Sequence, residues 1–298
     1  MKHWRDLLQP APDAETNAWR IFSGEGFRWG GIWVDHFDGR WLVQTTKDKF
    51  PEAFREAVPD PAGSLYWKRR EKTVKGAPQW IAGDLLAEPF EVSENGVRYR
   101  IDFGSGYSQG LFLDQRENRR RILDRVQPGE RVLNCFAYTC AFSVVAAKAG
   151  AITTSLDLSG PYLDWGKENL RANGIDPEGQ FFCKGDAFEW LETFHRQERR
   201  FNGVVIDPPT FSRNQKGKVF RAEKDYAELV ALACGVLEEE GWILCTGNTH
   251  HQAVKDFEAA VRDGVRRGRR ILSQLETFPM PPEYRREDYL KTVWVRVV

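Results

Sequence analysis

Hydrophobic and polar positions follow one rhythm from residue 131 to the end of the chain. Short apolar runs, typical of strands buried on both faces, alternate with longer segments of helical composition. The predicted strands are 131–136, 152–156, 180–183, 204–206 and 242–245, and the predicted helices are 141–149, 159–174, 187–195, 225–237 and 251–265. Two further strands, 270–278 and 290–297, follow without a helix between them. Five strand–helix units in series predict an α/β fold with a mostly parallel, Rossmann-like sheet and an antiparallel edge.

The pattern before residue 131 is different. Apolar runs at 31–35 and 41–45 flank Asp38-Gly39, which is a hairpin signal, and a short helix is predicted over 49–57. Another hairpin is predicted around residues 90–103, followed by a helix over 115–126. We therefore expect a small N-terminal α+β domain, residues 1–88, with a role in substrate recognition. Residues 89–298 would form a second domain that begins with the hairpin.

Composition narrows the class of protein. The chain has 298 residues, 41% of them hydrophobic, and a formal net charge of zero, so attraction to nucleic acid must come from local patches. No apolar run approaches the roughly 18 residues needed to span a membrane. The five cysteines are scattered, which argues against a disulfide framework and for a reducing cytoplasm. Histidines and cysteines show no zinc-ligand spacing, so no metal is expected. A monomer and a homodimer remain open.

Polar residues end four of the predicted strands. Asn134, Asp157, Asp186 and Asp207 would line one crevice, because ligands of open α/β sheets bind at the carboxyl ends of the strands. The spacing from Asn134 to Asp157 is close to the roughly 20 residues that separate a first strand–helix turn from a ribose-binding acid. The glycines of a dinucleotide loop are absent, so an adenosine ligand without a pyrophosphate fits better.

Two of the polar residues near these strand ends also suit helix capping. Thr139 is a good N-cap for the helix at 141–149. Asp186, with Glu189 three residues later, forms the pattern of a capping box. For Asp186 the capping role is a sufficient explanation by itself.

Residues 202–211 read NGVVIDPPTF and carry the most distinctive chemistry. The apolar run stops at Asp207, and two prolines then form a rigid elbow before Phe211. A carboxylate with prearranged carbonyl groups can hold a planar base that bears N–H groups, and an aromatic ring can stack on it. The alternative is a plain strand-to-loop stop, because Asp-Pro is an ordinary start of a turn.

Several separated motifs resemble those of class I S-adenosylmethionine-dependent methyltransferases. More closely, the chain is similar to the ribosomal RNA large-subunit methyltransferase family, whose members modify 5-methylcytosine and 7-methylguanine positions. The resemblance covers residue 18 to the end, without the family's separate N-terminal RNA-binding module. It rests on segments 32–35, 110–116, 134–139, 157–159, 185–187, 207–211 and 289–294, which occur in the family's order.

The resemblance implies a role for each matching residue. S-adenosylmethionine would be held by Asn134, Phe136, Ala137, Tyr138 and Thr139 around its methionine part, by Asp157 at the ribose, and by Leu158, Asp186 and Ala187 around the adenine. The catalytic side, facing the methyl group and the target base, would consist of Asp207, Pro208, Pro209 and Phe211. Phe112 and Asp114 would close the cofactor site from the other side.

The atom that receives the methyl group decides which nucleophile is needed. A base nitrogen supplies its own lone pair, whereas cytosine C5 needs a cysteine that adds to the ring. Where cytosine-modifying relatives carry that cysteine, this chain has Asn248, and Cys245 lies inside a predicted strand. The sequence therefore favours nitrogen methylation. Cytosine methylation through Cys245, a small-molecule or protein methyltransferase and a non-catalytic RNA-binding relative remain alternatives.

RNA, most simply ribosomal RNA, is the expected partner. Basic runs at 68–72, 116–121, 213–221 and 266–270 could supply the affinity, although each alone suits a solvated face. The loop after Phe211 is the best candidate, and its predicted substrate-binding residues are Arg213, Lys216 and Lys218.

Overall fold

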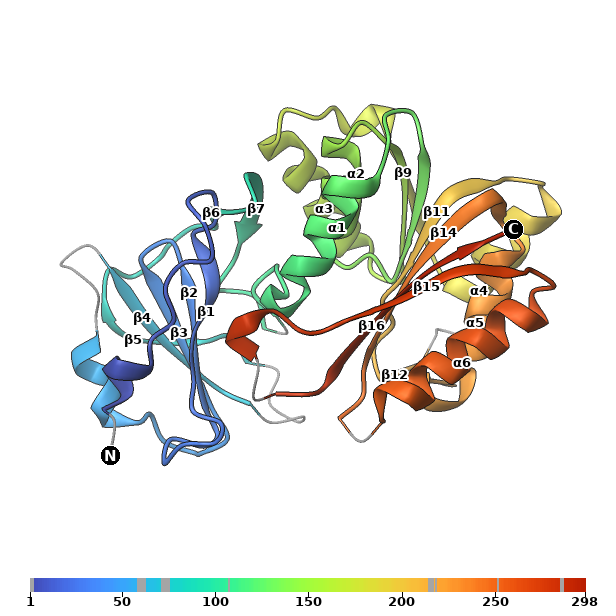
Figure 1. Ribbon diagram of the computed structural model, residues 1–298. Helices are drawn as coiled ribbons and strands as arrows, with labels where there is room; N and C mark the ends of the chain where they lie inside the picture. Colours follow the sequence, from blue (N-terminus) through green and yellow to red (C-terminus); the bar gives the residue numbers. More distant parts are fainter. Residues whose placement is uncertain are drawn as a thin grey trace. The chain divides into compact units, whose positions relative to one another are not determined.

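The chain folds into two compact units, Met1–Arg116 with Pro281–Glu287, and Glu117–Met280 with Asp288–Val298 (Figure 1). The structure is a computed structural model that describes residues 3–57, 63–70, 76–106, 108–213, 217, 219–250, 252–284 and 287–298. Within these ranges, no helix is both long and apolar enough to cross a membrane.

The first unit contains a five-stranded sheet in the order β1-β2-β3-β4-β5. Its strands are β1 (Ala18–Ser23), β2 (Ile32–Phe37), β3 (Arg40–Thr45), β4 (Ser64–Arg69) and β5 (Gln79–Gly83). Strands β3 and β4 pair in parallel, and the other neighbours are antiparallel. Asp38 and Gly39 have φ angles of 49° and 77°, as a tight two-residue hairpin turn requires. The predicted hairpin is thus confirmed.

Aromatic side chains form the core on one side of this sheet. Trp4, from the 3-10 helix η1 (Trp4–Leu7), stacks on Phe54 with ring centroids 4.7 Å apart. Phe54 belongs to η2 (Glu52–Ala57), so the helix predicted over 49–57 is shorter and of the 3-10 type. Both rings are almost fully buried and pack with Trp41 in the same cluster. Much of the chain's tryptophan content is therefore structural.

The hairpin of β6 (Phe90–Glu94) and β7 (Val97–Ile101) belongs to the first unit, which ends at Arg116 and not at the expected residue 88. Hydrogen bonds to the residues before β1 explain this. The Asn17 N–H donates to the Ser93 carbonyl at 2.9 Å, and the Ser93 N–H donates to Asn17 Oδ1 at 2.6 Å. The 3-10 helix η3 (Leu113–Gln115) also lies in this unit.

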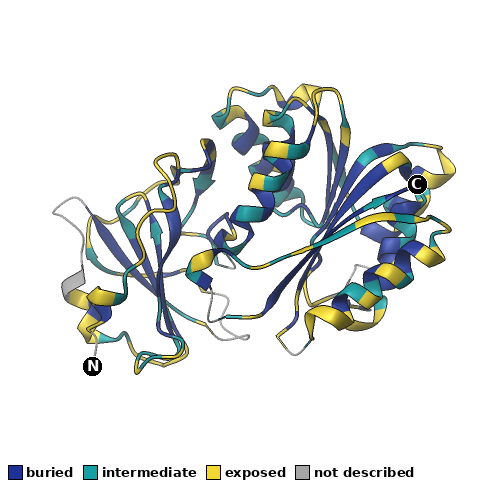
Figure 2. Ribbon diagram, in the orientation of Figure 1, coloured by how far each residue is buried: buried dark blue, intermediate teal, exposed yellow. Residues whose placement is uncertain are grey.

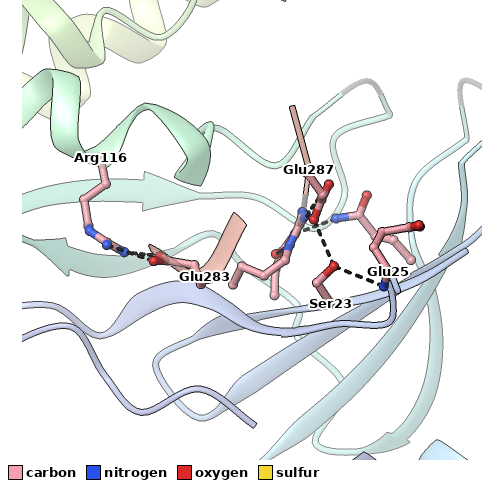
Figure 3. A network of polar contacts seen from close by, with 8 residues as sticks. Ser23, Glu25, Arg116, Glu283 and Glu287 are labelled. Carbon is pink, nitrogen blue, oxygen red and sulfur yellow. Dashed lines mark hydrogen bonds and ion pairs between the residues drawn. The ribbon is translucent and has the colours of Figure 1, made fainter. Parts of the chain in front are cut away.

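A short segment between β15 and β16, Pro281–Glu287, joins the first unit through buried charges (Figure 3). Arg20 Nη1 lies 3.1 Å from Glu287 Oε1, and Ser23 Oγ donates to the same oxygen at 3.0 Å. Arg116 pairs with Glu283 of η5 (Pro282–Tyr284). The side chains of both ion pairs are less than a tenth exposed. No pattern in the sequence predicted that this segment would pack with the first unit.

The second unit contains a seven-stranded sheet in the order β10-β9-β8-β11-β14-β16-β15 (Figure 1). The strands are β8 (Arg131–Cys135), β9 (Ile152–Asp157), β10 (Phe181–Lys184), β11 (Phe201–Ile206), β14 (Leu237–Asn248), β15 (Leu272–Phe278) and β16 (Leu290–Val297). Strands β10, β9, β8, β11 and β14 are parallel to one another. Strand β16 pairs antiparallel with β14 on one side and with β15 on the other. The predicted α/β sheet with an antiparallel edge is confirmed.

The last strand lies inside the sheet, between β14 and β15. Strand β16 is buried along almost its whole length, whereas β15 has several exposed positions (Figure 2). The strand that is buried on both faces therefore takes the interior place, and the partly exposed strand forms the edge. Leu237, which was expected to end a helix, instead begins β14 and pairs with Phe201.

Helices cover both faces of this sheet (Figure 1). One group consists of α1 (Arg116–Arg125), α2 (Ala141–Lys148) and α3 (Gly160–Ala172), and the other of α4 (Ala187–Arg196), α5 (Ala222–Cys234) and α6 (Val254–Arg267). The larger apolar core lies between the sheet and the second group. This arrangement brings the carboxyl ends of β8, β9, β10, β11 and β14 to one edge of the unit.

Candidate active site

The loop after β8 has an unusual backbone. Phe136, Tyr138 and Cys140 have φ angles of 60°, 49° and 60°, in the left-handed region that normally suits glycine. Each such residue costs about 1–2 kcal/mol. Strain of this kind persists where the surrounding structure fixes it and is frequent at ligand sites. The chain thus builds a glycine-like loop without glycines at these positions.

The neighbours of this loop hold its backbone. The Ala137 N–H donates to the Leu156 carbonyl of β9 at 2.9 Å, and Asn169 Nδ2 donates to the Thr139 carbonyl at 2.9 Å. A Cβ on Gly166 of α3 would lie 2.3 Å from Cys140 Sγ, so only glycine permits this approach. Because the loop continues through Cys140, that residue is the N-cap of α2, and the expectation that Thr139 caps this helix was wrong.

Asp157 lies at the end of β9 and accepts hydrogen bonds from two backbone N–H groups. Tyr138 donates to Oδ2 and Ser159 donates to Oδ1, each at 2.8 Å. Burial raises the pKa of the carboxyl group, while the N–H groups of Ser159, Tyr138 and Leu158 act in the opposite direction. Each carboxylate oxygen retains room for a second donor. A ribose hydroxyl pair is a suitable ligand for this carboxylate.

Asn134 lies near the end of β8, two residues before Phe136, and is fully buried. Its Nδ2 donates to Ser143 Oγ of α2 at 2.9 Å, and Ser155 Oγ of β9 also donates to Ser143 Oγ at 2.8 Å. Its Oδ1 has no hydrogen-bond partner within the described residues. Thr139 is likewise fully buried, and Ala137 nearly so. Ala137 and Thr139 are therefore the buried positions of the loop, while Phe136 and Tyr138 are partly exposed.

Asp186 caps α4, as expected. Its Oδ1 accepts from the N–H groups of Phe188 at 3.0 Å and Glu189 at 3.3 Å. The Gly185 N–H donates to the Asp157 carbonyl at 2.9 Å, which ties the end of β10 to the end of β9. Ala187 is buried, and Leu158 is partly exposed. The residues predicted to surround the adenine are therefore grouped around the ends of two neighbouring strands.

The Asp-Pro-Pro elbow follows β11 without a break. Asp207 is partly exposed and accepts a hydrogen bond from the Thr246 hydroxyl of β14 at Oδ1. Pro208 is buried and Pro209 is exposed. Thr210 Oγ1 donates to the Asn248 carbonyl at 2.7 Å, which fixes the elbow to the end of β14. Phe211 is 54% exposed, so its ring is available for stacking.

A small hairpin continues the elbow and returns toward the loop after β8. Strands β12 (Phe211–Arg213) and β13 (Val219–Arg221) pair antiparallel. The buried ring of Phe220 lies 6.0 Å from Phe136 and 5.8 Å from Phe188, measured between centroids. Phe220 therefore joins the elbow, the loop and α4. Sequence reasoning missed it, although an aromatic residue within the basic run was a usable signal.

Cys245 is fully buried in β14, between Ile206 of β11 and Val293 of β16. Burial raises the pKa of its thiol far above the usual range. A thiolate is the reactive form of cysteine, so this side chain is unsuited to attack a base. Asn248, three residues later, is exposed at the strand end.

The geometry described above does not test the remaining five predicted site residues. Phe112 is 40% exposed and Asp114 partly exposed, and both belong to the first unit. The backbone of Arg213 forms the last position of β12. Lys216 and Lys218 lie outside the described residues. The roles of all five positions stay predictions.

The donor set of the second unit suits an adenosine sulfonium cofactor. A partly buried carboxylate is held by backbone N–H groups, and a strained loop lies beside it. Asp157 would hold the ribose hydroxyls, the loop from Phe136 to Thr139 would surround the methionine part, and Leu158 and Ala187 would contact the adenine.

Comparison with known proteins agrees with this fit. Residues 61–293 match the family of S-adenosylmethionine-dependent methyltransferases, so the chain belongs to that family. Its cofactor is S-adenosylmethionine, and the expected resemblance is confirmed.

Individual relatives extend over most of the chain. Ribosomal RNA large subunit methyltransferase I of Aeromonas salmonicida (strain A449) is 32% identical over 93% of this chain and 74% of its own length. Ribosomal RNA large subunit methyltransferase K of Neisseria meningitidis serogroup B is 30% identical over 88% of this chain and 78% of its own.

Solved structures are also similar. SMU.776, crystallised in complex with SAH, is 29% identical and superposes with a TM-score of 0.84 over 96% of this chain and 76% of its own. A SAM-dependent methyltransferase from Agrobacterium tumefaciens, at 17% identity and a TM-score of 0.73, covers 98% of this chain and 92% of its own. At that identity the second likeness supports the fold alone.

Proposed function

We propose that this enzyme methylates a base nitrogen of ribosomal RNA in the cytoplasm. The observation that carries the proposal is the elbow after β11. It combines an aspartate oriented by Thr246, a rigid Pro208-Pro209 backbone and a half-exposed Phe211 ring. Relatives that are named as ribosomal RNA large subunit methyltransferases supply the choice of RNA.

The residues act by alignment. Bound S-adenosylmethionine supplies an electrophilic methyl group, and transfer requires the attacking atom to lie in line with it. Asp207 and the carbonyl oxygens of the elbow would accept hydrogen bonds from the base, and Phe211 would stack on its face. A nitrogen lone pair then needs no protein nucleophile. The buried Cys245 with its raised thiol pKa weighs against cytosine C5 chemistry.

The substrate must present its base outside a stack, because an enzyme cannot reach a base atom within a duplex. We expect Arg213, Lys216 and Lys218 to contact phosphates of the RNA. These contacts would make activity fall as salt rises. A monomer and a homodimer both fit the proposal.

The test is transfer of a radioactive methyl group from S-adenosylmethionine to large-subunit ribosomal RNA isolated from cells that lack the gene. We expect label in the RNA, recovered as an N-methylated nucleoside after digestion. Label on protein or a metabolite, insensitive to salt, would support a small-molecule or protein methyltransferase. Calorimetry with S-adenosylmethionine covers the remaining case: absence of binding would indicate a non-catalytic relative, and Asp157→Ala should lose the binding that the wild type shows.

A further inference from the structure

One buried hydroxyl contacts the carboxylate at the centre of the proposed chemistry. Strands β11 and β14 pair in parallel with Ile206 opposite Cys245, so the next residues, Asp207 and Thr246, lie side by side. Thr246 is fully buried, and its hydroxyl donates to Asp207 Oδ1. The same hydroxyl oxygen lies 3.4 Å from the Ile206 carbonyl, a weaker acceptor at that distance.

Tyr226 fixes the backbone on both sides of this contact. Its hydroxyl oxygen lies 2.9 Å from the Thr246 carbonyl and 3.2 Å from the Ile206 carbonyl. The ring comes from α5, is buried, and packs edge-on against Phe257 of α6 at 4.8 Å. Burial raises the pKa of the Tyr226 hydroxyl well above its ordinary value, so it stays a neutral donor. The two strand ends therefore have little freedom to move apart.

A free aspartate at a strand end would sample several side-chain rotamers. Threonine is branched at Cβ and stiff at χ1, so its hydroxyl is a donor of fixed direction. A donor of this kind holds one carboxylate oxygen and thereby fixes the plane of the carboxylate. Hydrogen bonds to charged groups are also stronger than those to neutral ones.

We propose that Thr246 is a positioning residue that orients the Asp207 carboxylate toward the target base. This rests on the proposed function, in which Asp207 accepts hydrogen bonds from that base. Thr246 would not touch the base. It would act by holding Asp207 ionised and in one rotamer before the RNA binds.

The first test needs no RNA. Carboxyl resonances of protein labelled with ¹³C-aspartate are titrated, and Asp207→Asn identifies the Asp207 signal. Loss of a donor to the charged form raises a carboxyl pKa. Thr246→Val should therefore move the Asp207 titration to higher pH, and Thr246→Ser should restore it. Tyr226 and Cys245, the titratable neighbours from α5 and β14, remain neutral because burial raises both of their pKa values.

Controls separate the hydroxyl from general effects on folding. Thr292→Val removes a buried hydroxyl from the facing position of β16, where Thr292 Oγ1 accepts from Asn118, and it should leave the Asp207 titration unchanged. If Thr246→Val does not fold, Thr246→Ala takes its place, because it removes the hydroxyl without adding a methyl group. An Asp207 titration identical in the wild type and in the folded hydroxyl-free variant would overturn the proposal.

The second test uses the methyl-transfer assay with large-subunit RNA. Thr246→Val should lower kcat about 10- to 100-fold, the size expected for a lost hydrogen bond to a charged group, with the KM for S-adenosylmethionine within about twofold. Thr246→Ser should recover most of kcat. Wild-type kcat in Thr246→Val, with Asp207→Ala inactive, would refute only the role of Thr246. Activity in Asp207→Ala would instead refute the proposed site, and the carboxyl titration would still decide the contact.

Discussion

Both units contain carboxylates that are at least partly buried, but the partners of these carboxylates differ. In the first unit, Asp35 and Glu287 pair with Arg20, and Glu283 pairs with Arg116 (Figure 3). In the second unit, Asp157 is held by backbone N–H groups and Asp207 by a threonine hydroxyl. An acid matched by arginine has its charge neutralised inside the protein. An acid held by neutral donors receives no counter-charge from them and can accept further hydrogen bonds from a ligand.

These partners distinguish the structural acids of the first unit from the acids of the second unit that we propose to bind ligands. The cost of removing both charges from water offsets much of the attraction within a buried ion pair. The acids of the first unit therefore matter for stability mainly because, without them, the buried arginines would be left unpaired. The neutral donors of the second unit set direction and leave acceptor sites for a ribose or a base. Substitutions should consequently act on stability in one unit and on catalysis in the other.

The largest effect is expected for Asp207→Ala. Removing a carboxylate that holds the base in the transition state should lower transfer to RNA by about 10³-fold. The dissociation constant of S-adenosylmethionine, measured by calorimetry, should stay within about threefold of the wild type. Asp176→Ala, which removes an exposed helix-capping aspartate from the same unit, is the matched control and should remain active. A wild-type rate in Asp207→Ala would show that the elbow is not the acceptor site.

A change in stability with little change in cofactor binding is expected for Glu287→Ala. It removes one of the two buried carboxylates that pair with Arg20, while Asp35 remains, so the unfolding free energy should fall by about 1.5–3 kcal/mol, as for a lost hydrogen bond to a charged group. Tryptophan fluorescence during urea unfolding is a suitable signal, because seven of the eleven tryptophans lie in the first unit.

The exposed pair of Arg98 and Glu91 offers the control for that measurement. Glu91→Ala should change the unfolding free energy by less than about 1 kcal/mol. Equal effects of the two substitutions would mean that burial does not distinguish these pairs. A loss of S-adenosylmethionine binding in Glu287→Ala at unchanged stability would mean that the network belongs to the functional site.

The smallest effect is expected for Cys245→Ala. The thiol is buried and its raised pKa keeps it protonated, so its removal should change kcat by less than about threefold. The same RNA assay measures this. Abolished turnover with unchanged S-adenosylmethionine binding would restore the cytosine mechanism.

Much of the second unit could be predicted from local pattern. Apolar runs of the length of strands, the capping of α4 by Asp186 and the polar strand ends at Asp157 and Asp207 are properties of neighbouring residues. The left-handed loop could not be predicted, because the residue types at Phe136, Tyr138 and Cys140 do not indicate positive φ angles. The contact of Thr246 with Asp207 depends on the strand register and was likewise invisible.

The first unit was less predictable, because its polar contacts are long-range. Strand β1 (Ala18–Ser23) was not expected, although Arg20 within it forms the centre of the buried network. Glu287 lies far from Arg20 along the chain, and only the fold brings them together. The domain boundary at residue 88 missed the hairpin β6–β7 for the same reason: Asn17 and Ser93 meet only in the folded unit.

We propose above that the Asp207 elbow directs methylation of a base nitrogen in ribosomal RNA. The most direct measurement is nucleoside mass spectrometry of ribosomal RNA from three strains, carrying the wild-type gene, no gene, and the gene with Asp207→Ala. We expect that one N-methylated nucleoside present in the first strain is missing from the other two. A missing C5-methylated cytidine, or identical nucleoside profiles in all three strains, would contradict it.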